Sequence, residues 1–292
     1  TLVDGYMQDP IFEYYGINAH DFWTEVNALP KKYKEEQGVL VNPDTIYLNQ
    51  FIRYAKSGKF KGLTNEKLKE FGEQLKFYKG VPEIFQKTKD LIEKNSQEYD
   101  IKVEHDIVST GMSQIIRGSS VMPYVENIWG CELIEGKDDA GDPCISEIGF
   151  TIDNTTKTRA LFEINKGVNS KDGREGVKVN TKIPEELRRV HFINMIYVAD
   201  GPSDIPAFSV VNKNAGATFA IYPKGDMKAM KQVEQMRVEG RINMYAEADY
   251  TENTTAYMWI CAKITEFAER IRSEEKQKIA KYAAFEGPKH II

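Results

Sequence analysis

The spacing of apolar residues changes near residue 100 and divides the chain into two parts. From about residue 10 to residue 99, apolar residues recur at steps of three and four, as Leu68, Phe71 and Leu75 do, and no alternating stretch interrupts them. Pro82 indicates the start of a further helix, because its fixed φ suits a first turn. The pattern predicts a helical subdomain over residues 10–99.

From residue 100 onward, short apolar runs alternate with stretches long enough for crossover helices, which is typical of an α/β domain. Alternation around Gly136 and Gly141 predicts one or two antiparallel hairpins attached to the sheet. A long helix is predicted near the end of the chain. The segments concerned are Ile107-Val108, Asn194–Ala199 and Ala217–Tyr222 for the buried strands, Cys131–Ile164 for the hairpins and about Thr255–Ala284 for the helix.

Composition and charge limit the classes of function. Of 292 residues, 41% are hydrophobic and 28% are charged, which is the balance of a soluble globular protein with a substantial core. The 39 basic and 44 acidic residues give a formal net charge of −5, so the mean field repels nucleic acid and anionic membranes. We therefore expect neither as a partner.

Three cysteines, Cys131, Cys144 and Cys261, are too few and too far apart for a disulfide framework or a zinc knuckle. No apolar run approaches the ~20 residues needed to cross a bilayer, and the first residues lack the basic and apolar regions of a signal peptide. These features predict a cytoplasmic protein.

The first candidate site follows the predicted strand at Ile107-Val108. Ser109, Thr110 and Gly111 come directly after its apolar residues. Open α/β sheets bind ligands at the carboxyl ends of their strands, and a hydroxyl beside free backbone N–H groups suits a phosphate. The same residues also suit an ordinary helix N-cap, so both interpretations stay open.

The second candidate site consists of Asp200 and Asp204, after the strand predicted at Asn194–Ala199. Gly201 and Pro202 turn the chain so that Asp204 can return to the side of Asp200. Mg²⁺ is usually held by one or two carboxylates with water and substrate phosphate, so the pair predicts a Mg²⁺ site. A simple polar turn is the alternative.

Lys166 is the third candidate, because it ends the apolar run that begins at Phe162 and precedes Gly167. Its ammonium would neutralise a cluster of carboxylates and a phosphate. Alone it carries little weight, since most of the 39 basic residues are expected on the solvated surface.

Taken in order, these sites resemble motifs two, three and four of the haloacid dehalogenase superfamily, most of whose members are Mg²⁺-dependent phosphohydrolases. Ser109, Lys166, Asp200 and Asp204 match those motifs. The string Asp-Gly-Pro-Ser-Asp-Ile-Pro-Ala-Phe, which begins at Asp200, is a fairly specific form of the fourth motif.

The resemblance implies a fold as well as a site. It predicts an α/β protein with a three-layer α/β/α, Rossmann-like core of parallel strands and a β-hairpin excursion. Residues 1–9 and 100–292 would form this core. Residues 10–99 would form an inserted helical cap that closes over the site and selects the substrate.

The chain departs from the family pattern at its first residues. Family members carry Asp-x-Asp-x-Thr-Leu at the end of their first strand, with the first Asp as nucleophile and the second as general acid/base. Thr1 and Leu2 match only the tail of that motif, and Asp4 is out of register with both aspartates. We therefore expect the two aspartates just upstream of Thr1, outside the printed sequence.

The resemblance also implies a role for each matching residue. The nucleophile would form an aspartyl phosphate that water then hydrolyses. Ser109 and the amides of Thr110 and Gly111 would hold the phosphoryl oxygens, Lys166 would pair with the nucleophile and the phosphate, Asp200 would bind Mg²⁺, Asp204 would support the metal or its water, and Thr1 would add a hydroxyl.

We therefore expect a Mg²⁺-dependent phosphatase whose partner is a small phosphorylated metabolite. The alternative is a non-catalytic module that binds a phosphate ligand or a protein on the same scaffold and has lost its nucleophile. The residues that precede Thr1 discriminate between the two. The aromatic residues at Phe12, Tyr14, Tyr15 and Phe22 are expected to pack in a core rather than to line a substrate pocket.

Overall fold

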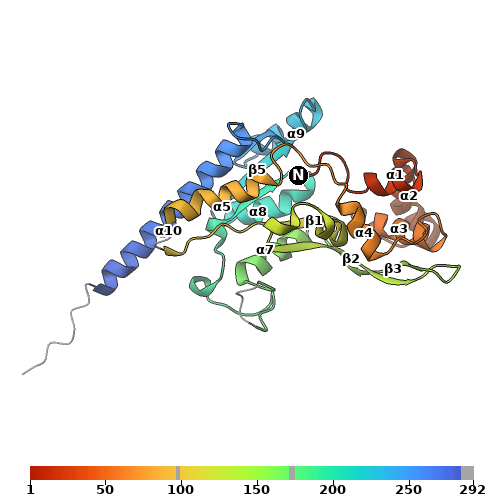
Figure 1. Cartoon of the computed structure of the whole chain (residues 1–292), viewed down its shortest axis with the longest axis horizontal. Coiled ribbons are helices and arrows are strands. Elements are labelled where there is room, and N and C mark those ends of the chain that lie inside the picture. The colour runs from red at the N-terminus through yellow and green to blue at the C-terminus, as the bar shows by residue number, and fades with distance from the viewer. Residues whose placement is uncertain (97–98, 171–174, 284–292) are drawn as a thin grey trace, which may run out of the picture.

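A computed structural model describes residues 1–96, 99–170 and 175–283 (Figure 1). Helices make up about half of the chain, and short 3-10 turns lie between some of the longer elements. The α-helices are α1 (Asp9–Tyr15), α2 (Ala19–Gln37), α3 (Ile46–Lys56), α4 (Asn65–Gly72), α5 (Glu83–Ser96), α6 (Ser113–Gly118), α7 (Thr156–Lys166), α8 (Ile205–Lys213), α9 (Met227–Val238) and α10 (Thr255–Ala283).

The strands form two separate three-stranded sheets. In the first sheet, β1 (Asp106–Met112) pairs parallel with β2 (Asn127–Lys137), and β2 pairs antiparallel with β3 (Pro143–Phe150). In the second, β4 (Ile196–Ala199), β5 (Ala217–Tyr222) and β6 (Met244–Glu247) are all parallel, in that order. The first sheet is mixed and the second is entirely parallel.

The predicted three-layer α/β/α core with one Rossmann-like parallel sheet is therefore wrong. Among the described strands, no ladder joins β1, β2 or β3 to β4, β5 or β6. Apolar runs identified the strands, but periodicity is local and does not specify which strands pair.

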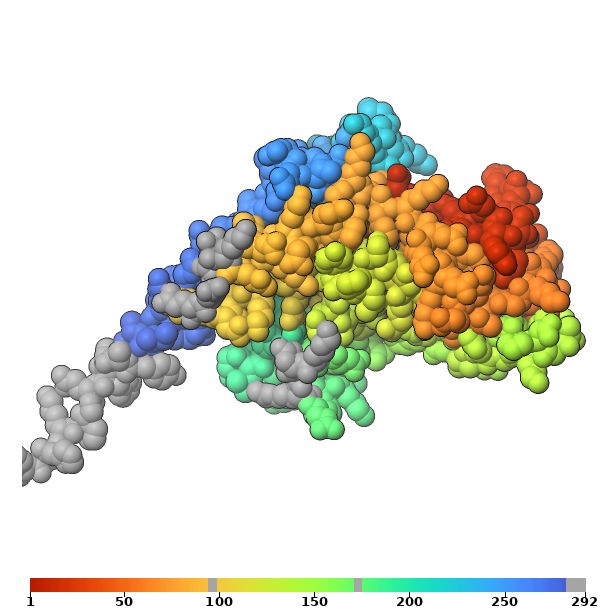
Figure 2. Space-filling view, viewed as in Figure 1, coloured from red at the N-terminus to blue at the C-terminus, as the bar shows by residue number. Residues whose placement is uncertain are grey.

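The predicted helical cap is also wrong, because α1 to α4 share one hydrophobic cluster with the first sheet. Phe22 of α2 and Phe51 of α3 belong to the same buried cluster as Ile115 of α6, Cys131 of β2 and Ile145 of β3. A cap would have a core of its own. Figure 2 shows the orange part of the chain lying against the yellow-green β2–β3 hairpin, with the red part against the orange.

Two glycines allow α4 and α6 to cross in backbone contact. A Cβ on Gly72 would lie 2.1 Å from the carbonyl oxygen of Ile115, and a Cβ on Gly118 would lie 1.9 Å from that of Lys69. Neither distance is possible for a real side chain, so both positions require glycine. This crossing fixes the N-terminal helices to the first sheet.

A second hydrophobic cluster connects the two sheets. Ile107 of β1 and Val198 of β4 pack against the same buried group, which includes Phe219 of β5, Ile84 of α5 and Ile260 of α10. In Figure 1, α5 runs alongside α10, which extends beyond the rest of the molecule. Thus α5, which was expected in the cap, packs with the sheets.

Several local predictions are confirmed. The strands predicted at Ile107-Val108, Asn194–Ala199 and Ala217–Tyr222 correspond to β1, β4 and β5, and β2 and β3 form an antiparallel hairpin. The long C-terminal helix is α10, although its predicted last residue, number 284, lies outside the described residues.

One segment was assigned the wrong structure: residues 156–166 form α7 rather than part of a hairpin. Ala160, Leu161 and Ile164 are spaced as one helical face. The Asp153 carboxylate accepts hydrogen bonds from the N–H groups of Thr155 (3.0 Å) and Thr156 (2.7 Å), which starts the helix.

Further predictions concern packing and surface. Phe12 and Phe22 are core residues, as expected, whereas Tyr14 is 61% exposed and Tyr15 is partly buried. Cys131, Cys144 and Cys261 are free thiols. A membrane-spanning helix would need a longer apolar run than any helix in the described part of the chain provides.

Candidate functional site

The candidate site lies at the carboxyl end of β4. Asp200 directly follows the last strand residue, Ala199, so the sheet fixes its backbone. The next residues form a 3-10 turn, in which the N–H of Asp204 donates to the carbonyl of Gly201 (3.0 Å). Both carboxylates therefore lie at the same strand end, where we predicted them.

Asp204 is bound by three protein groups. Its Oδ1 accepts from the ammonium of Lys157 (2.7 Å) and the hydroxyl of Tyr197 (2.6 Å), and its Oδ2 accepts from the hydroxyl of Ser203 (3.3 Å). Only 3% of Asp204 is exposed. In this structure Asp204 therefore fixes the Lys157 ammonium, and the more accessible carboxylate for the predicted metal is that of Asp200.

Tyr197 is held in the same network. Burial, and then the negative charge of Asp204, keep the pKa of the Tyr197 hydroxyl well above its usual value. The hydroxyl therefore remains protonated and donates to Asp204. Because Tyr197 lies on β4 and Lys157 on α7, the network connects the second sheet to the helix beside it.

Asp200 differs from Asp204, because 46% of its side chain is exposed. Its Oδ2 accepts from the backbone nitrogen of Thr1 (2.5 Å) and from the Thr1 hydroxyl (3.3 Å). Burial raises the pKa of the Asp200 carboxyl, whereas the Lys157 ammonium and the Thr1 hydroxyl act to lower it. Asp200 is thus a partly exposed carboxylate within the positive field of Lys157.

Thr1 is brought to the site as the sequence predicted. Its carbonyl accepts a hydrogen bond from the hydroxyl of Tyr250 (3.0 Å), which is only 3% exposed. Leu2 packs against the cluster that connects the two sheets. These contacts hold the Thr1 hydroxyl beside Asp200.

The structure places Lys166 away from this site. Its ammonium donates to the carbonyls of Val179 and Thr181. Lys157 and Lys166 lie nine residues apart on α7, which corresponds to about 13 Å along the helix axis. The lysine that approaches both aspartates is Lys157, which sequence reasoning missed.

A signal for Lys157 was present in the sequence. It is the second residue of α7 and lies four residues after Asp153, whose carboxylate caps the helix. A cation in a first helical turn is disfavoured by the helix dipole, so it needs a strong anionic partner. The segment was predicted to be a strand, and a strand has no comparable dipole, so the sequence did not single out Lys157.

Ser109, Thr110 and Gly111 form a bulge at the end of β1. Val108 pairs with Trp129 and Met112 with Cys131, so three residues oppose one residue of β2. The Ser109 hydroxyl accepts from the N–H of Gly111 (3.0 Å), and the Thr110 carbonyl accepts from the Tyr47 hydroxyl (2.8 Å).

These bonds change part of the predicted phosphate site. The Gly111 amide, which was expected to hold a phosphoryl oxygen, is already bound by Ser109. The Ser109 segment belongs to the first sheet, whereas Asp200 follows a strand of the second. Among the described strands, no hydrogen-bonded ladder connects these two sheets. The strand-end position of Ser109 is as predicted, but its geometry is that of a bulge.

A cavity of about 460 Å³ lies against α2. It is lined by Tyr6, Ala19, His20, Trp23 and Asn27. The Trp23 ring lies 5.9 Å from the ring of Tyr47, whose hydroxyl binds the Thr110 carbonyl. Tyr47 therefore lies between this partly aromatic cavity and the end of β1.

Comparison with known proteins gives a relative of similar length. The chain is 35% identical over 278 residues to an uncharacterized protein of Borreliella burgdorferi, and the match covers 90% of this chain and 93% of that protein. The chain belongs to the same family as that protein. No family model matches the chain, and no solved structure matches it.

The residues at this strand end fit a divalent cation only in part. Asp200 offers an exposed carboxylate, whose Oδ2 contacts the backbone nitrogen and the hydroxyl of Thr1. Asp204 offers no unbound oxygen of comparable access. Within the described ranges, no three His, Cys, Asp or Glu side chains gather to hold a metal. A Mg²⁺ ion here would rest on Asp200, water and a ligand phosphate.

Proposed function

We propose that this protein is a Mg²⁺-dependent phosphohydrolase of the haloacid dehalogenase type, acting on a small phosphomonoester. The observation that carries the proposal is the arrangement of Lys157, Asp204 and Asp200 at the end of β4. A buried lysine fixed by one carboxylate, beside a second and exposed carboxylate, provides separate sites for an anion and for a cation.

Lys157 is the group suited to the phosphoryl charge. Its side chain is 8% exposed, and its bond to Asp204 fixes the ammonium in one position. The ammonium also lowers the pKa of Asp200, so its positive field reaches the place where a ligand of Asp200 would lie. In phosphoryl transfer, such a fixed charge stabilises the developing negative charge without reorganisation.

Asp204 and Tyr197 act as positioning residues in this proposal. They hold the Lys157 ammonium at the strand end, and they neither touch the substrate nor bind the metal. Asp200 would hold Mg²⁺, which when bound would neutralise phosphate charge. The resemblance assigns the attacking aspartate to a position before Thr1.

The substrate class follows from charge and space. Asp200 and Lys157 would contact only the phosphate and its counter-ion. The organic part of the substrate must therefore be recognised by other surfaces. The cavity of about 460 Å³ lined by Tyr6, Trp23 and their neighbours suits a small organic group rather than a polymer. The net charge of −5 also disfavours nucleic acid as a substrate.

The test uses protein expressed from the complete reading frame of its gene. A panel of small phosphomonoesters is assayed for phosphate release with Mg²⁺, with EDTA, and with Lys157→Met or Lys166→Met. We expect Mg²⁺-dependent hydrolysis that Lys157→Met, assayed at a temperature at which its thermal melt shows it to be folded, lowers by at least about 100-fold, as expected for removal of a fixed charge at the transition state. Lys166→Met is the matched control and should retain activity.

The possible outcomes separate the two functions. Hydrolysis that persists in EDTA contradicts the role of the metal. Binding of phosphomonoesters without turnover, together with a reading frame that lacks the two aspartates, favours the non-catalytic binding module. Equal loss in both lysine variants would contradict the assignment of Lys157.

A further inference from the structure

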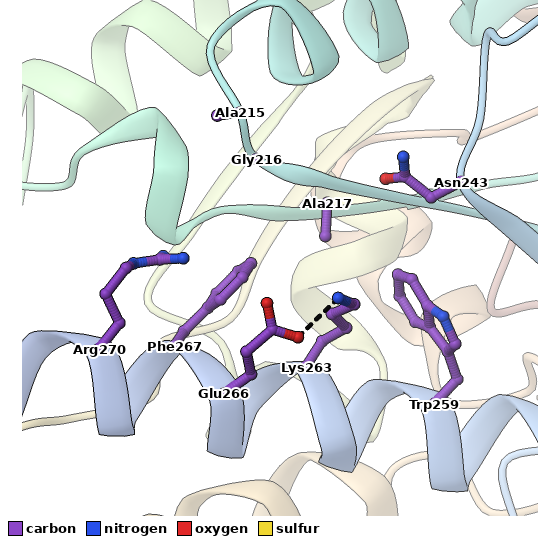
Figure 3. Close-up of a pocket in the computed structure, with 9 residues that line it drawn as sticks. All are labelled: Ala215, Gly216, Ala217, Asn243, Trp259, Lys263, Glu266, Phe267 and Arg270. Atoms are coloured by element: carbon purple, nitrogen blue, oxygen red, sulfur yellow. Dashed lines mark hydrogen bonds and ion pairs between the residues drawn. The ribbon is translucent and has the colours of Figure 1, made fainter.

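A second cavity, of about 360 Å³, lies at the amino ends of β5 and β6. Residues 215–217, at the start of β5, and Asn243, just before β6, form one side, and α10 forms the other (Figure 3). Asp200 follows the opposite, carboxyl end of β4, which is parallel to β5. The cavity is therefore separate from the candidate phosphatase site.

One face of α10 supplies the side chains of this cavity. Figure 3 shows all five pointing from the helix toward the strand ends. Their spacing of four, three, one and three residues places them on one side of the helix. They are Trp259, Lys263, Glu266, Phe267 and Arg270.

Arg270 is a fixed cation at one end of the cavity. Its Nη2 donates to the carbonyl of Ile193 (2.6 Å) and to the side-chain oxygen of Asn194 (2.7 Å), and the guanidinium lies 4.5 Å from the centre of the Phe267 ring. These partners are all neutral. Across residues 1–96, 99–170 and 175–283, no carboxylate forms an ion pair with Arg270, and its Nε is buried without a hydrogen-bond partner.

Trp259 is a fixed aromatic surface at the other end. Its indole stacks on Phe219 of β5, with 4.8 Å between ring centres and 21° between planes. Between Trp259 and Arg270 lies Lys263, whose ammonium is 2.6 Å from the Glu266 carboxylate. The three charged side chains therefore leave one net positive charge on the cavity wall.

Apart from Asn243, the facing side has little side chain. A Cβ on Gly216 would lie 2.4 Å from the carbonyl oxygen of Phe192, so no larger residue fits there. The neighbouring residues, Ala215 and Ala217, carry only methyl groups. This side leaves a narrow space opposite the aromatic rings.

We propose that this cavity binds a small organic anion with a planar aromatic group. The carboxylate or similar acidic group would contact Arg270 and Lys263, and the ring would pack along Trp259. A charge-assisted hydrogen bond from a preorganised guanidinium is strong, and aromatic contacts add to it. The volume is near the lower end for small-molecule sites, so a ligand of the size of benzoate fits best.

Calorimetric titration of the full chain with benzoate tests the proposal. Acetate carries the charge without the ring, and benzyl alcohol carries the ring without the charge, so both should bind at least about tenfold more weakly than benzoate. Lys263→Gln and Arg270→Lys should each weaken benzoate binding by about tenfold, which corresponds to loss of one charge-assisted contact. The matched control is Lys276→Gln, an exposed position on the same helix outside the cavity.

Thermal melts of each variant separate binding from folding. If Arg270→Lys lowers the melting temperature because its bond to Asn194 is lost, the result for Lys263→Gln decides the test. No benzoate binding at millimolar concentration would overturn the proposal, as would equal weakening by Lys276→Gln or equal binding of acetate and benzoate. The titration needs no catalytic activity, so its outcome is independent of the proposed phosphohydrolase.

Discussion

The ammonium of Lys157 lies 2.7 Å from the carboxylate of Asp204, and both side chains are almost completely buried. Forty-seven residues separate them in the sequence, so the pair connects α7 to the turn after β4. A buried ion pair repays the cost of desolvation only when its remaining polar atoms are also bonded. The Tyr197 and Ser203 hydroxyls meet that requirement for Asp204.

We expect removal of either partner to be strongly destabilising. Lys157→Met leaves the Asp204 carboxylate buried without its counter-charge, and Asp204→Ala leaves the ammonium unpaired. Each should lower the free energy of unfolding by about 3–5 kcal/mol, measured by urea denaturation. The double variant should lose much less than the sum of the single losses.

The control is the exposed pair Lys31–Glu35 on α2, with side chains 79% and 64% exposed. Glu35→Ala should change the free energy of unfolding by less than about 1 kcal/mol. Additive losses in the Lys157 and Asp204 double variant would show that the two groups do not act as a pair.

The crossing of α4 and α6 gives a second prediction. Because the Cβ of an alanine at position 118 would meet the carbonyl of Lys69, the helices must separate in Gly118→Ala. We expect a loss of about 2–4 kcal/mol in the free energy of unfolding, as for other overpacked sites.

Gly62→Ala is no suitable control, because Gly62 has a φ of +71°. Gly201→Ala is suitable, because its nearest neighbour would be 3.5 Å away and it should cost under about 1 kcal/mol.

Local structure was predictable where the signal is local. The apolar run at Ala217–Tyr222 is β5, and Pro82 lies directly before α5. Strand pairing and the sharing of a core are not local, because they bring together residues far apart in the sequence, such as Phe51 and Ile145 in one buried cluster. The single sheet and the separate cap were predicted from a family resemblance, and the structure supports neither.

The site was predictable in part for the same reason. Asp200 and Asp204 follow a recognisable strand, so their common location could be inferred from the sequence. Which aspartate is exposed depends on Lys157 and Tyr197, which reach Asp204 from two different elements. The choice of Lys166 over Lys157 followed from assigning α7 as a strand.

The difference in exposure between the two aspartates gives a third prediction. Asp200→Asn removes a charge from a side chain that is 46% exposed, so the melting temperature should change by only a few degrees. Calorimetric titration with Mg²⁺ alone should show affinity reduced at least about tenfold. Asp204→Asn should show the reverse, with a large loss of stability and little direct effect on Mg²⁺ affinity. Unchanged Mg²⁺ binding in Asp200→Asn would contradict its role as ligand.

The pH dependence of stability gives a fourth prediction, from the adjacent residues His105 and Asp106. Burial, with a contribution from Lys89, lowers the pKa of His105 from 6.5 to about 4. Burial, with a contribution from Glu104, raises the pKa of Asp106 from 3.8 to about 6. The two shifts therefore have opposite consequences over nearly the same range of pH.

For His105, the unfolded chain takes up a proton between pH 6.5 and pH 4 that the folded protein does not, so acidification lowers stability. For Asp106, the folded protein keeps a proton between pH 3.8 and pH 6 that the unfolded chain releases, so acidification raises stability. In the parent protein the two effects largely cancel between about pH 4 and pH 6. Each can contribute at most about 1.4 kcal/mol per pH unit.

Single substitutions should reveal the two opposed effects. His105→Phe keeps a ring against Phe85, whose ring centre is 4.8 Å away, and removes the titrating group, so its stability should rise more on acidification than that of the parent. Asp106→Asn should lose stability on acidification more steeply than the parent. Urea denaturation at half-unit steps from pH 4.5 to pH 7 measures both slopes relative to the parent. If both variants keep the slope of the parent, neither group titrates as its burial requires, because removing a silent group leaves the proton balance between folded and unfolded states unchanged.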